Sequence, residues 1–548
     1  MPRKQVKIKE EGFMNSVIII MASQIFIKIV GLIYRVYLTN REGFGDRGNA
    51  IYSGGYQIYS LLLLLSTVGI PSAISKLVSE KLAKKDYFEA HRIFKVSFLL
   101  VSGIGLVGSI VLFALADYIS NNLLLIPESA LTIKCLAPSI FFVSMSATIR
   151  GYFLGMQISK PTASSQTLEQ ILKTTFTILF VEVIAYITCT STELMAAGAN
   201  LATTASVILS FVYIFRFYML RRKEIWTNIN SQEKKNDLET KKSIIKKVLL
   251  VAIPISLTSI IVSINKCIDT VTIMRGLTNF LTQEQAKIQY GILTGKVDTL
   301  IGLPLAFNVA FSIALIPTLS SAKVKKDNKD INQKISISIL ISILIALPAS
   351  IGMCVFADPI LKLVFPNESQ GANILSAISF MILFTTIGQT LNGALQGLGR
   401  LKIPIIALAI GIGVKTILNI VLIPIQAIGI YGATFSSILC YFITFVIEMI
   451  ALIRITKIKF NIFKIAIKPA IASLGMIAVS MLCFKLMLPS LGNDISIIIA
   501  IAIAVIIYGV LVIGLKVLDK EEWKLIPKGE KIYNMLGKIK RKLIKQNV

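Results

Sequence analysis

Runs of eighteen or more apolar residues recur from one end of this 548-residue chain to the other, and each run is long enough to cross a bilayer as a helix. Hydrophobic side chains make up 55% of the residues and charged side chains only 16%. About 25% of the residues in an average soluble domain are charged. The chain is therefore predicted to be a polytopic membrane protein without a large soluble domain.

The membrane spans are predicted to be helices. Backbone groups in hydrocarbon must bond within their own segment, and the alternating pattern of a barrel strand is absent from the sequence. The fold class is therefore an all-α polytopic membrane protein of about fourteen transmembrane helices. The predicted spans are 13–38, 50–78, 93–115, 131–155, 164–187, 195–219, 246–272, 291–320, 334–357, 371–398, 403–424, 429–453, 465–487 and 495–517.

The connectors between these spans alternate in charge. The connector 221–247, "RRKEIWTNINSQEKKNDLETKKSIIKK", is rich in Lys and Arg, whereas 114–130, "ALADYISNNLLLIPESA", contains neither. The positive-inside rule then predicts that this multi-pass protein has both termini in the cytoplasm. This asymmetry and the basic tail account for most of the formal net charge of +28, so nucleic acid is not expected as a partner.

The C-terminal tail has an amphipathic pattern. Ile532, Leu536, Ile539 and Leu543 recur at helical spacing, with Lys and Arg residues between them. Such a segment is predicted to form a short helix on the anionic inner leaflet, although a disordered basic tail is the alternative. Anionic inner-leaflet lipids are therefore expected partners.

Two connections between predicted spans have similar sequences. The segments "ATIRGYFLGMQISKP" (147–161) and "TLNGALQGLGRLKIP" (390–404) each contain a Gly-x-x-x-Gly step, a basic turn and a proline. Gly151 and Gly393 are 242 residues apart (393 − 151). The repeat predicts two parallel six-helix lobes plus two C-terminal helices, with the substrate path at the lobe interface. The glycines themselves are typical of close helix packing.

The repeat and the charge pattern together predict the domain organisation. The predicted parts are an N-terminal lobe (1–222), a cytoplasmic basic linker (223–245), a C-terminal lobe (246–455), two appended helices (456–517) and a basic cytoplasmic tail (518–548).

The stretch "RGYFLGMQISKPTASSQTLEQILK" (150–173), with "GIPSAISKLVSE" (69–80) upstream, resembles a known family. It is similar to the flippases of the multidrug/oligosaccharidyl-lipid/polysaccharide exporter superfamily, in the branch of stage V sporulation protein B and the polysaccharide transporters. That branch is similar to the lipid II flippase MurJ. The resemblance implies movement of an undecaprenyl-diphosphate-linked sugar, either lipid II or a polysaccharide unit, from the inner to the outer leaflet. It also implies roles in cell-wall synthesis and sporulation, with proteins of cell-wall synthesis as candidate partners.

Charged residues inside the first span are candidate substrate ligands. Gln24, Lys28 and Arg35 are spaced by four and seven residues, which places them on one helical face. A charge near the bilayer centre costs roughly 2.5–3.5 kcal/mol on insertion scales. This face is therefore predicted to line a wet cavity, and snorkelling of the cations to headgroups is the alternative.

The seventh and eighth spans carry a second set of candidate substrate ligands. These are Lys266 and Asp269 in the seventh span, and Lys296 and Asp298 in the eighth. Asp269 falls near the repeat equivalent of Arg35, which suggests an ion pair that forms in one transport state. A static pair that lowers the insertion cost is the alternative.

Three further intramembrane charges, Lys173, Lys415 and Glu182, are secondary cavity candidates. The whole set is mostly cationic, and Lys and Arg are natural partners of phosphate oxygens. A lipid-linked oligosaccharide diphosphate fits this balance better than a cationic drug. Glu169 and Lys173 are four residues apart and are predicted to bridge each other, while Arg150 is predicted to anchor the helix at the cytoplasmic boundary.

Two other function classes fit the sequence less well. A cation-coupled multidrug exporter of the same superfamily would need acidic residues in the first span, and 13–38 has none. A membrane-embedded transferase would need a positioned acid/base set, but the single histidine, His91, lies in a charged connector and is predicted to be a solvated surface residue. The six cysteines have no disulfide or zinc spacing. No catalytic residue, metal or cofactor is expected, and the protein is not expected to be an enzyme.

Overall fold

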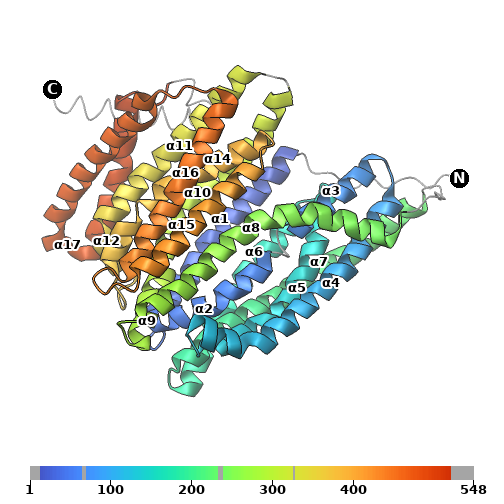
Figure 1. Ribbon diagram of the computed structural model, residues 1–548, viewed down its shortest axis with the longest axis horizontal. Helices are drawn as coiled ribbons and strands as arrows, with labels where there is room; N and C mark the ends of the chain where they lie inside the picture. The colour runs from blue at the N-terminus through green and yellow to red at the C-terminus, as the bar shows by residue number, and fades with distance from the viewer. Residues whose placement is uncertain (1–12, 65–68, 232–238, 325–326, 520–548) are drawn as a thin grey trace. The chain divides into compact units, whose positions relative to one another are not determined.

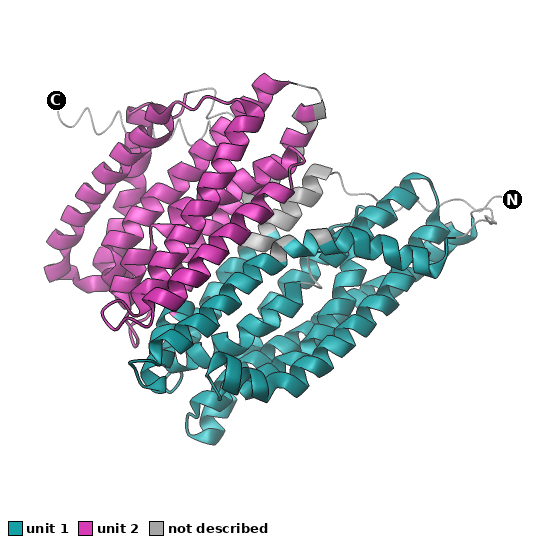
Figure 2. Ribbon diagram, in the orientation of Figure 1, with its two compact units in different colours: residues 1–295 teal, residues 296–548 magenta. Residues whose placement is uncertain are grey.

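A computed structural model describes residues 13–64, 69–231, 239–324 and 327–519 (Figure 1). These residues form helices and no strand, which confirms the predicted all-α class. The helices divide into two compact units, residues 1–295 and 296–548 (Figure 2). The predicted tail helix at 529–548 lies outside the described residues.

Unit 1 is a bundle of long helices with shorter segments between them. Its elements are α1 (Phe13–Asn40), α2 (Gly45–Leu64), α3 (Ile70–Ala83), α4 (Tyr87–Tyr118), the π-helix Ile119–Leu124, α5 (Ser129–Gly155), α6 (Lys160–Thr188), α7 (Thr192–Asn230), α8 (Lys241–Leu277) and α9 (Gln283–Gly291). A π-helix, Ile292–Val297, follows at the division between the units.

Unit 2 is built in the same way from the second half of the chain. Its elements are α10 (Asp298–Val324), α11 (Asn328–Val355), α12 (Ala357–Val364), α13 (Ala372–Ile378), α14 (Met381–Gly397), α15 (Lys402–Leu422), α16 (Ile430–Thr456), the π-helix Phe463–Ile467 and α17 (Lys468–Gly514).

Within the described residues, ten helices are long and apolar enough to cross a membrane, or eleven if the bent helix α8 counts as one span. Helix α17 covers two of the predicted spans, and its backbone leaves the helical conformation at Gly492, where φ is 69°. A positive φ of this size favours glycine because it has no Cβ. The protein is thus a multi-span helical membrane protein, and the total of about fourteen spans stays a prediction.

Short sequence signals fix where several helices begin. Asp86 caps α4 by accepting a hydrogen bond from the Glu89 amide at 3.2 Å. Thr282 and Gln285 form a capping box at the start of α9, and Pro161 lies in the first turn of α6, where no amide proton is needed. These local signals determine where each of the three helices begins.

The segment 223–245, predicted as a basic linker, is helical at both ends. Helix α7 continues to Asn230 and α8 already begins at Lys241. The compact units divide near residue 295, whereas the sequence repeat divides the chain before 246. The boundary of the compact units depends on how the helices pack, whereas the boundary of the repeat depends on which segments are duplicated. The lobe bounds at 222 and 246 therefore stay a prediction.

Glu239 ties this segment to two helices of unit 1. Its carboxylate accepts hydrogen bonds from Lys247 on α8 and Lys81 on α3, both at 2.7 Å. These two bonds hold the pKa of Glu239 below its usual range. The remaining exposure of the three side chains makes this a modest, salt-sensitive contact.

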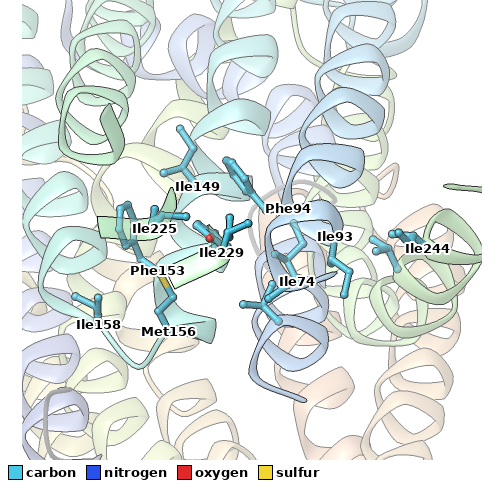
Figure 3. Close-up of a cluster of buried hydrophobic side chains, with 14 of the residues drawn as sticks. Ile74, Ile93, Phe94, Ile149, Phe153, Met156, Ile158, Ile225, Ile229 and Ile244 are labelled. Carbon is cyan, nitrogen blue, oxygen red and sulfur yellow. The ribbon is translucent and has the colours of Figure 1, made fainter. Parts of the chain in front are cut away.

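A hydrophobic cluster fills the space between α3, α4, α5 and α7 and includes Ile74, Phe94, Ile149 and Phe153 (Figure 3). His91 lies at its edge and is only 4% exposed, so the prediction of a solvated histidine is wrong.

The reason for the burial of His91 is that α4 already begins at Tyr87, which turns the histidine toward the bundle. Its ring lies 5.9 Å from the rings of both Tyr152 and Trp226, and its Nδ1 is 3.3 Å from the hydroxyl of Tyr152. His91 is therefore a packing residue of unit 1.

The duplicated glycines perform the same task in both units. A Cβ at Gly151 on α5 would lie 2.8 Å from the backbone of Pro71 on α3. A Cβ at Gly393 on α14 would lie 2.7 Å from the backbone oxygen of Ser312 on α10. The α3–α5 pair of unit 1 and the α10–α14 pair of unit 2 can thus approach closely because a glycine side chain is absent, which agrees with the duplication in the sequence.

Gly393→Ala should lower the stability of the protein, because the added methyl group meets backbone that cannot move aside. We expect a loss of about 1–3 kcal/mol in the free energy of unfolding. Gly413→Ala is the matched control, since no atom lies within 4 Å of the position of its Cβ. It should be neutral or stabilising by about 0.5–1 kcal/mol. Thermal unfolding of the purified variants measures both, and an equal response of the two would contradict this packing account.

Candidate functional site

Lys173 of α6 lies among tyrosine rings inside unit 1. Its side chain is only 7% exposed, and its Nζ is 4.6 Å from the ring centroid of Tyr56 and 5.3 Å from that of Tyr34. A cation within about 6 Å of a ring centroid is attracted to the electron-rich face. Rings from α2 and α1 therefore stabilise this ammonium group away from water.

Arg35 of α1 continues the same arrangement. Its Cζ is 4.4 Å from the ring centroid of Tyr52, which stacks on Tyr56 with 5.8 Å between centroids. Its Nη1 and Nη2 donate hydrogen bonds to Asn49 and Ser53 of α2, both at 3.4 Å. We call the following five residues the cationic–aromatic cluster: Tyr34, Arg35, Tyr52, Tyr56 and Lys173.

The cluster follows from simple spacing and packing rules. Tyr52, Tyr56 and Tyr59 are four and three residues apart, so α2 presents them on one face. Helix α1 is fixed to α6 where the hydroxyls of Ser23 and Thr167 lie 2.8 Å apart. The tyrosine series was a signal in the sequence that an analysis of charges alone missed.

Neither cation of the cluster has a carboxylate partner among the residues that the structure describes. Their recorded contacts are aromatic rings for Lys173, and a ring, an amide oxygen and a hydroxyl for Arg35. Two positive charges within apolar helices are therefore balanced only by polarisable and neutral groups. Such a site can accept an anion without first breaking an ion pair.

Glu169, predicted to bridge Lys173, instead pairs with Arg150 of α5 at 2.8 Å. Arg150 also donates to the hydroxyls of Ser165 and Ser210, both at 3.0 Å, and is 7% exposed. The predicted bridge between Glu169 and Lys173 is therefore wrong, and the predicted place of Arg150 at the cytoplasmic boundary stays a prediction. A guanidinium with several donors satisfies the carboxylate and two hydroxyls together, which a lysine one turn away on α6 cannot do.

Two other predicted residues lie on α1 with Arg35. Lys28 is two turns before Arg35 on this helix, and its side chain is exposed. Gln24 lies one turn earlier, and its side chain is outside the described residues. A cavity face along α1 that includes these two residues stays a prediction.

Lys266 and Asp269 lie on α8, which belongs to unit 1. Between them along the helix, the Cys267 thiol contacts the backbone oxygen of Gln57 on α2 at 3.4 Å. Gln57 directly follows Tyr56, so α8 meets α2 at the level of the cationic–aromatic cluster. The exposed Lys266 and the half-buried Asp269 are the charged residues of α8 next to this contact. The Arg35–Asp269 pair stays a prediction.

Three predicted residues belong to unit 2. Lys296 is fully buried and donates to the backbone oxygen of Glu368 at 2.7 Å. Asp298 is half-buried at the start of α10, and Lys415 is buried at 1% exposure on α15. The backbone contact of Lys296 gives it a structural role in this conformation.

Glu182 lies away from the cluster. Its carboxylate accepts hydrogen bonds from Arg41 at 2.9 Å and from the Tyr37 hydroxyl. It is nine residues beyond Lys173, or about 14 Å along α6. Glu182 therefore forms a partly exposed ion pair near the connection between α1 and α2.

An ion cluster that is not among the predicted site residues joins α2, α9 and the connection between α4 and α5. Lys287 is 2% exposed and donates to both Glu128 and Glu284. Arg47 lies 3.1 Å from Glu284 and 3.5 Å from Glu128. Burial raises the pKa of Glu128, but the hydrogen bond from Lys287 outweighs it and holds the pKa below the usual range. Glu284 is three residues from Lys287, but Arg47 and Glu128 are far from both in the sequence, so no local pattern predicts the whole cluster.

The chemistry of the cationic–aromatic cluster is that of binding. It presents a guanidinium, an ammonium group, ring faces and tyrosine hydroxyls. Among the described residues, no group of three or more His, Cys, Asp or Glu side chains could hold a metal ion. The two cations suit an anionic group.

Comparison with known proteins agrees with this fold. The model of the family described as "Polysaccharide biosynthesis protein" matches residues 13–323, and a second model, MatE, matches residues 294–421. The chain is 25% identical over 483 residues to the "Lipid II flippase MurJ" of Bacillus subtilis (strain 168), covering 86% of this chain and 87% of that protein.

Two further similarities extend over most of the chain. "Stage V sporulation protein B" of Bacillus subtilis (strain 168) is 23% identical over 523 residues, covering 94% of this chain and 98% of that protein. The solved structure "Lipid II flippase MurJ, inward closed conformation" has the same fold, with a TM-score of 0.66 at 17% identity, covering 91% of this chain and 99% of that one. The chain therefore belongs to the polysaccharide biosynthesis protein family, within the multidrug/oligosaccharidyl-lipid/polysaccharide superfamily of membrane transporters.

Proposed function

We propose that this protein is an alternating-access flippase that moves an undecaprenyl-diphosphate-linked sugar from the inner to the outer leaflet. The observation that carries the proposal is the pair of cations, Lys173 and Arg35, that aromatic rings hold without a carboxylate partner in the described part of unit 1. A lipid diphosphate supplies the missing negative charge, and its polyprenyl chain stays in the bilayer. The name of the relative MurJ supports a lipid-linked wall precursor as the substrate class.

The remaining charged residues have graded roles in this proposal. Lys28 and Gln24 extend the cationic face along α1, and Lys266 and Asp269 contribute from α8. Lys296, Asp298 and Lys415 are candidates for contacts in unit 2. The cations attract the diphosphate, and the carboxylates weaken its binding. Without the carboxylates, the path would bind a dianion too tightly for it to dissociate.

The setting of the proposal is the bacterial cell membrane, with both termini in the cytoplasm, anionic inner-leaflet lipids around the basic tail and proteins of cell-wall synthesis as partners. The protein acts without a cofactor and is not an enzyme. The relatives named above, a lipid II flippase and a sporulation protein, fit this setting.

A cation-coupled multidrug exporter is the second candidate, and the MatE match over residues 294–421 favours it. The two candidates differ in the charge of the cargo. A cationic drug would be repelled by Lys173 and Arg35, whereas a diphosphate would be attracted.

The deciding experiment measures lipid-linked sugars in cells depleted of the protein. We expect one undecaprenyl-diphosphate-linked precursor to accumulate, and re-expression of the wild type to reverse the accumulation. Susceptibility to cationic drugs is measured in the same cells. Unchanged precursor levels together with increased drug accumulation would instead establish the exporter.

The orientation is tested by cysteine labelling in a cysteine-free background. Asn122 and Asn230 are both exposed asparagines, one in the connection after α4 and the other at the end of α7. Asn122→Cys should react with an impermeant maleimide in intact cells, and Asn230→Cys should react only after the membrane is opened. The reverse pattern would place both termini outside the cytoplasm.

A further inference from the structure

Glu448 is a buried acid that the proposed function does not use. It lies on α16 in unit 2, and its side chain is 2% exposed. Its Oε2 has no hydrogen-bond partner in the structure. A buried carboxyl oxygen without a partner within a membrane-spanning helix is a costly arrangement and points to a function.

The neighbouring helix α14 leaves room for this carboxyl group. Phe384 of α14 packs against Phe442 and Phe445 of α16, with ring centroids 5.1 and 5.9 Å apart. One turn further along α14 comes Gly388, and a Cβ there would lie 3.8 Å from Oε2 of Glu448. The carboxyl group thus faces a position without a side chain, so it has space but no polar neighbour at that point.

Few charges lie near Glu448 on the helices that pack against α16. Helices α13 and α14 contain no charged residue. On α15, Gly411 faces Cys440 and Thr444, so Lys415 lies near the level of Cys440. That level is eight residues from Glu448, or about 12 Å along the helix axis.

The other charges lie at the end of the bundle where α16 terminates. Lys402 begins α15, and Arg454 is six residues beyond Glu448 on α16; both are exposed. On α11, Lys334 forms an ion pair with Asp330 at 2.6 Å, near Lys329 in the first turn. Each of these groups is closer to the helix ends than Glu448 is, so none of them replaces the missing partner of Oε2.

We propose that Glu448 is a proton-binding site of unit 2, loaded in the conformation described here. A carboxyl group that is buried without an adjacent cation has a lower free energy in its neutral form than in its ionised form. When unit 2 opens this site to water, the O–H bond breaks, the electron pair stays on the carboxylate oxygen and the proton passes to water. The proton site itself is independent of the substrate; its link to transport rests on the proposed function.

The site is tested on the purified full-length protein by infrared spectroscopy. A protonated carboxyl group has a carbonyl stretch that a carboxylate lacks. The difference spectrum between wild type and Glu448→Gln at about pH 7 should contain this band, because a solvated glutamate is ionised there. Glu193→Gln, at an exposed acid, is the matched control and should leave the band unchanged. Identical spectra of wild type and Glu448→Gln would overturn the site.

Two further arms make the result decisive. The first arm tests whether Glu448 instead binds sodium or potassium as an ionised carboxylate. In that case the band would appear only when these ions are replaced by choline. A protonated Glu448 should give the same band in all three salts. If Glu448→Gln does not fold, the wild type is treated with dicyclohexylcarbodiimide instead. This reagent modifies protonated carboxyl groups in apolar surroundings. Modification at Glu448 that weakens as the pH rises supports the site, and modification independent of pH overturns it.

The link to transport is tested separately in the depleted cells. Glu448→Gln should reduce relief of precursor accumulation by about 5- to 150-fold, the usual range of a coupling free energy, and abolish its dependence on external pH. If Glu448→Gln relieves precursor accumulation normally and with the usual pH dependence, the proton site is not coupled to transport. The proton site itself would not be contradicted by that result. Failure of the wild type to relieve accumulation would instead contradict the proposed function.

Discussion

Lys173→Glu should abolish relief of precursor accumulation in cells depleted of the wild-type protein. The substitution removes the ammonium group from the faces of Tyr56 and Tyr34 and puts a carboxylate in its place. A charge-assisted contact contributes about 1.5–3 kcal/mol, so loss of the cation alone, in Lys173→Met, should weaken transport about tenfold or more. The glutamate adds repulsion of the diphosphate to that loss. Lys173→Arg should be the mildest variant because it keeps the charge.

The matched control is Lys362→Glu. Lys362 is a half-exposed lysine of α12 that pairs with Asp358 at 2.7 Å, and exposed pairs contribute little. Protein levels in the membrane must be equal, because removal of a buried charge can itself change insertion. Full activity of a well-expressed Lys173→Glu variant would exclude the cluster from the substrate path.

The face along α1 is tested in the same assay. The double variant Lys28→Glu, Arg35→Glu should not relieve precursor accumulation. If it does so normally, the face along α1 is not part of the substrate path.

Arg150→Met should destabilise the protein by about 1–3 kcal/mol, the usual cost of leaving polar groups without their hydrogen-bond donor, because Arg150 is buried and Glu169 is half-buried. The variant leaves the Glu169 carboxylate and the hydroxyls of Ser165 and Ser210 without their donor. Thermal unfolding of the purified protein in detergent measures the loss.

Two variants separate this account from a simple loss of packing. Arg150→Met, Glu169→Gln removes both charges and should recover part of the stability, since no buried charge is left unpaired. Lys334→Met breaks an ion pair in which both side chains are 37% exposed and should change stability by less than about 1 kcal/mol. An Arg150→Met protein as stable as the wild type would mean that the ion pair has no net effect.

The helical class and the duplicated close contact could be predicted because they depend on properties that lie along the sequence. Apolar length determines a span, and glycines four residues apart determine where a helix can approach another. Gly151 and Gly393 can therefore be identified from the sequence alone, without their partners on α3 and α10.

The partners of charged residues could not be predicted in this way. The rule for residues four apart joined Lys173 to Glu169, but rings from α1 and α2, more than a hundred residues earlier, surround the lysine. His91 was judged by its charged neighbours in sequence, although α4 turns it inward. Glu448 has no charged residue within five positions, yet a lone acid in an apolar run was itself a signal.

The two glycine contacts have a consequence for the order in which the protein is assembled. Pro71 and Gly151 are 80 residues apart (151 − 71), and Ser312 and Gly393 are 81 apart (393 − 312), so each contact closes within its own unit. Contacts of limited sequence separation form early, and chains are synthesised from the N-terminus. The α3–α5 pair can therefore lock while α10 is still being synthesised. The second pair then repeats that step, so we expect the helices of unit 1 to pack before those of unit 2.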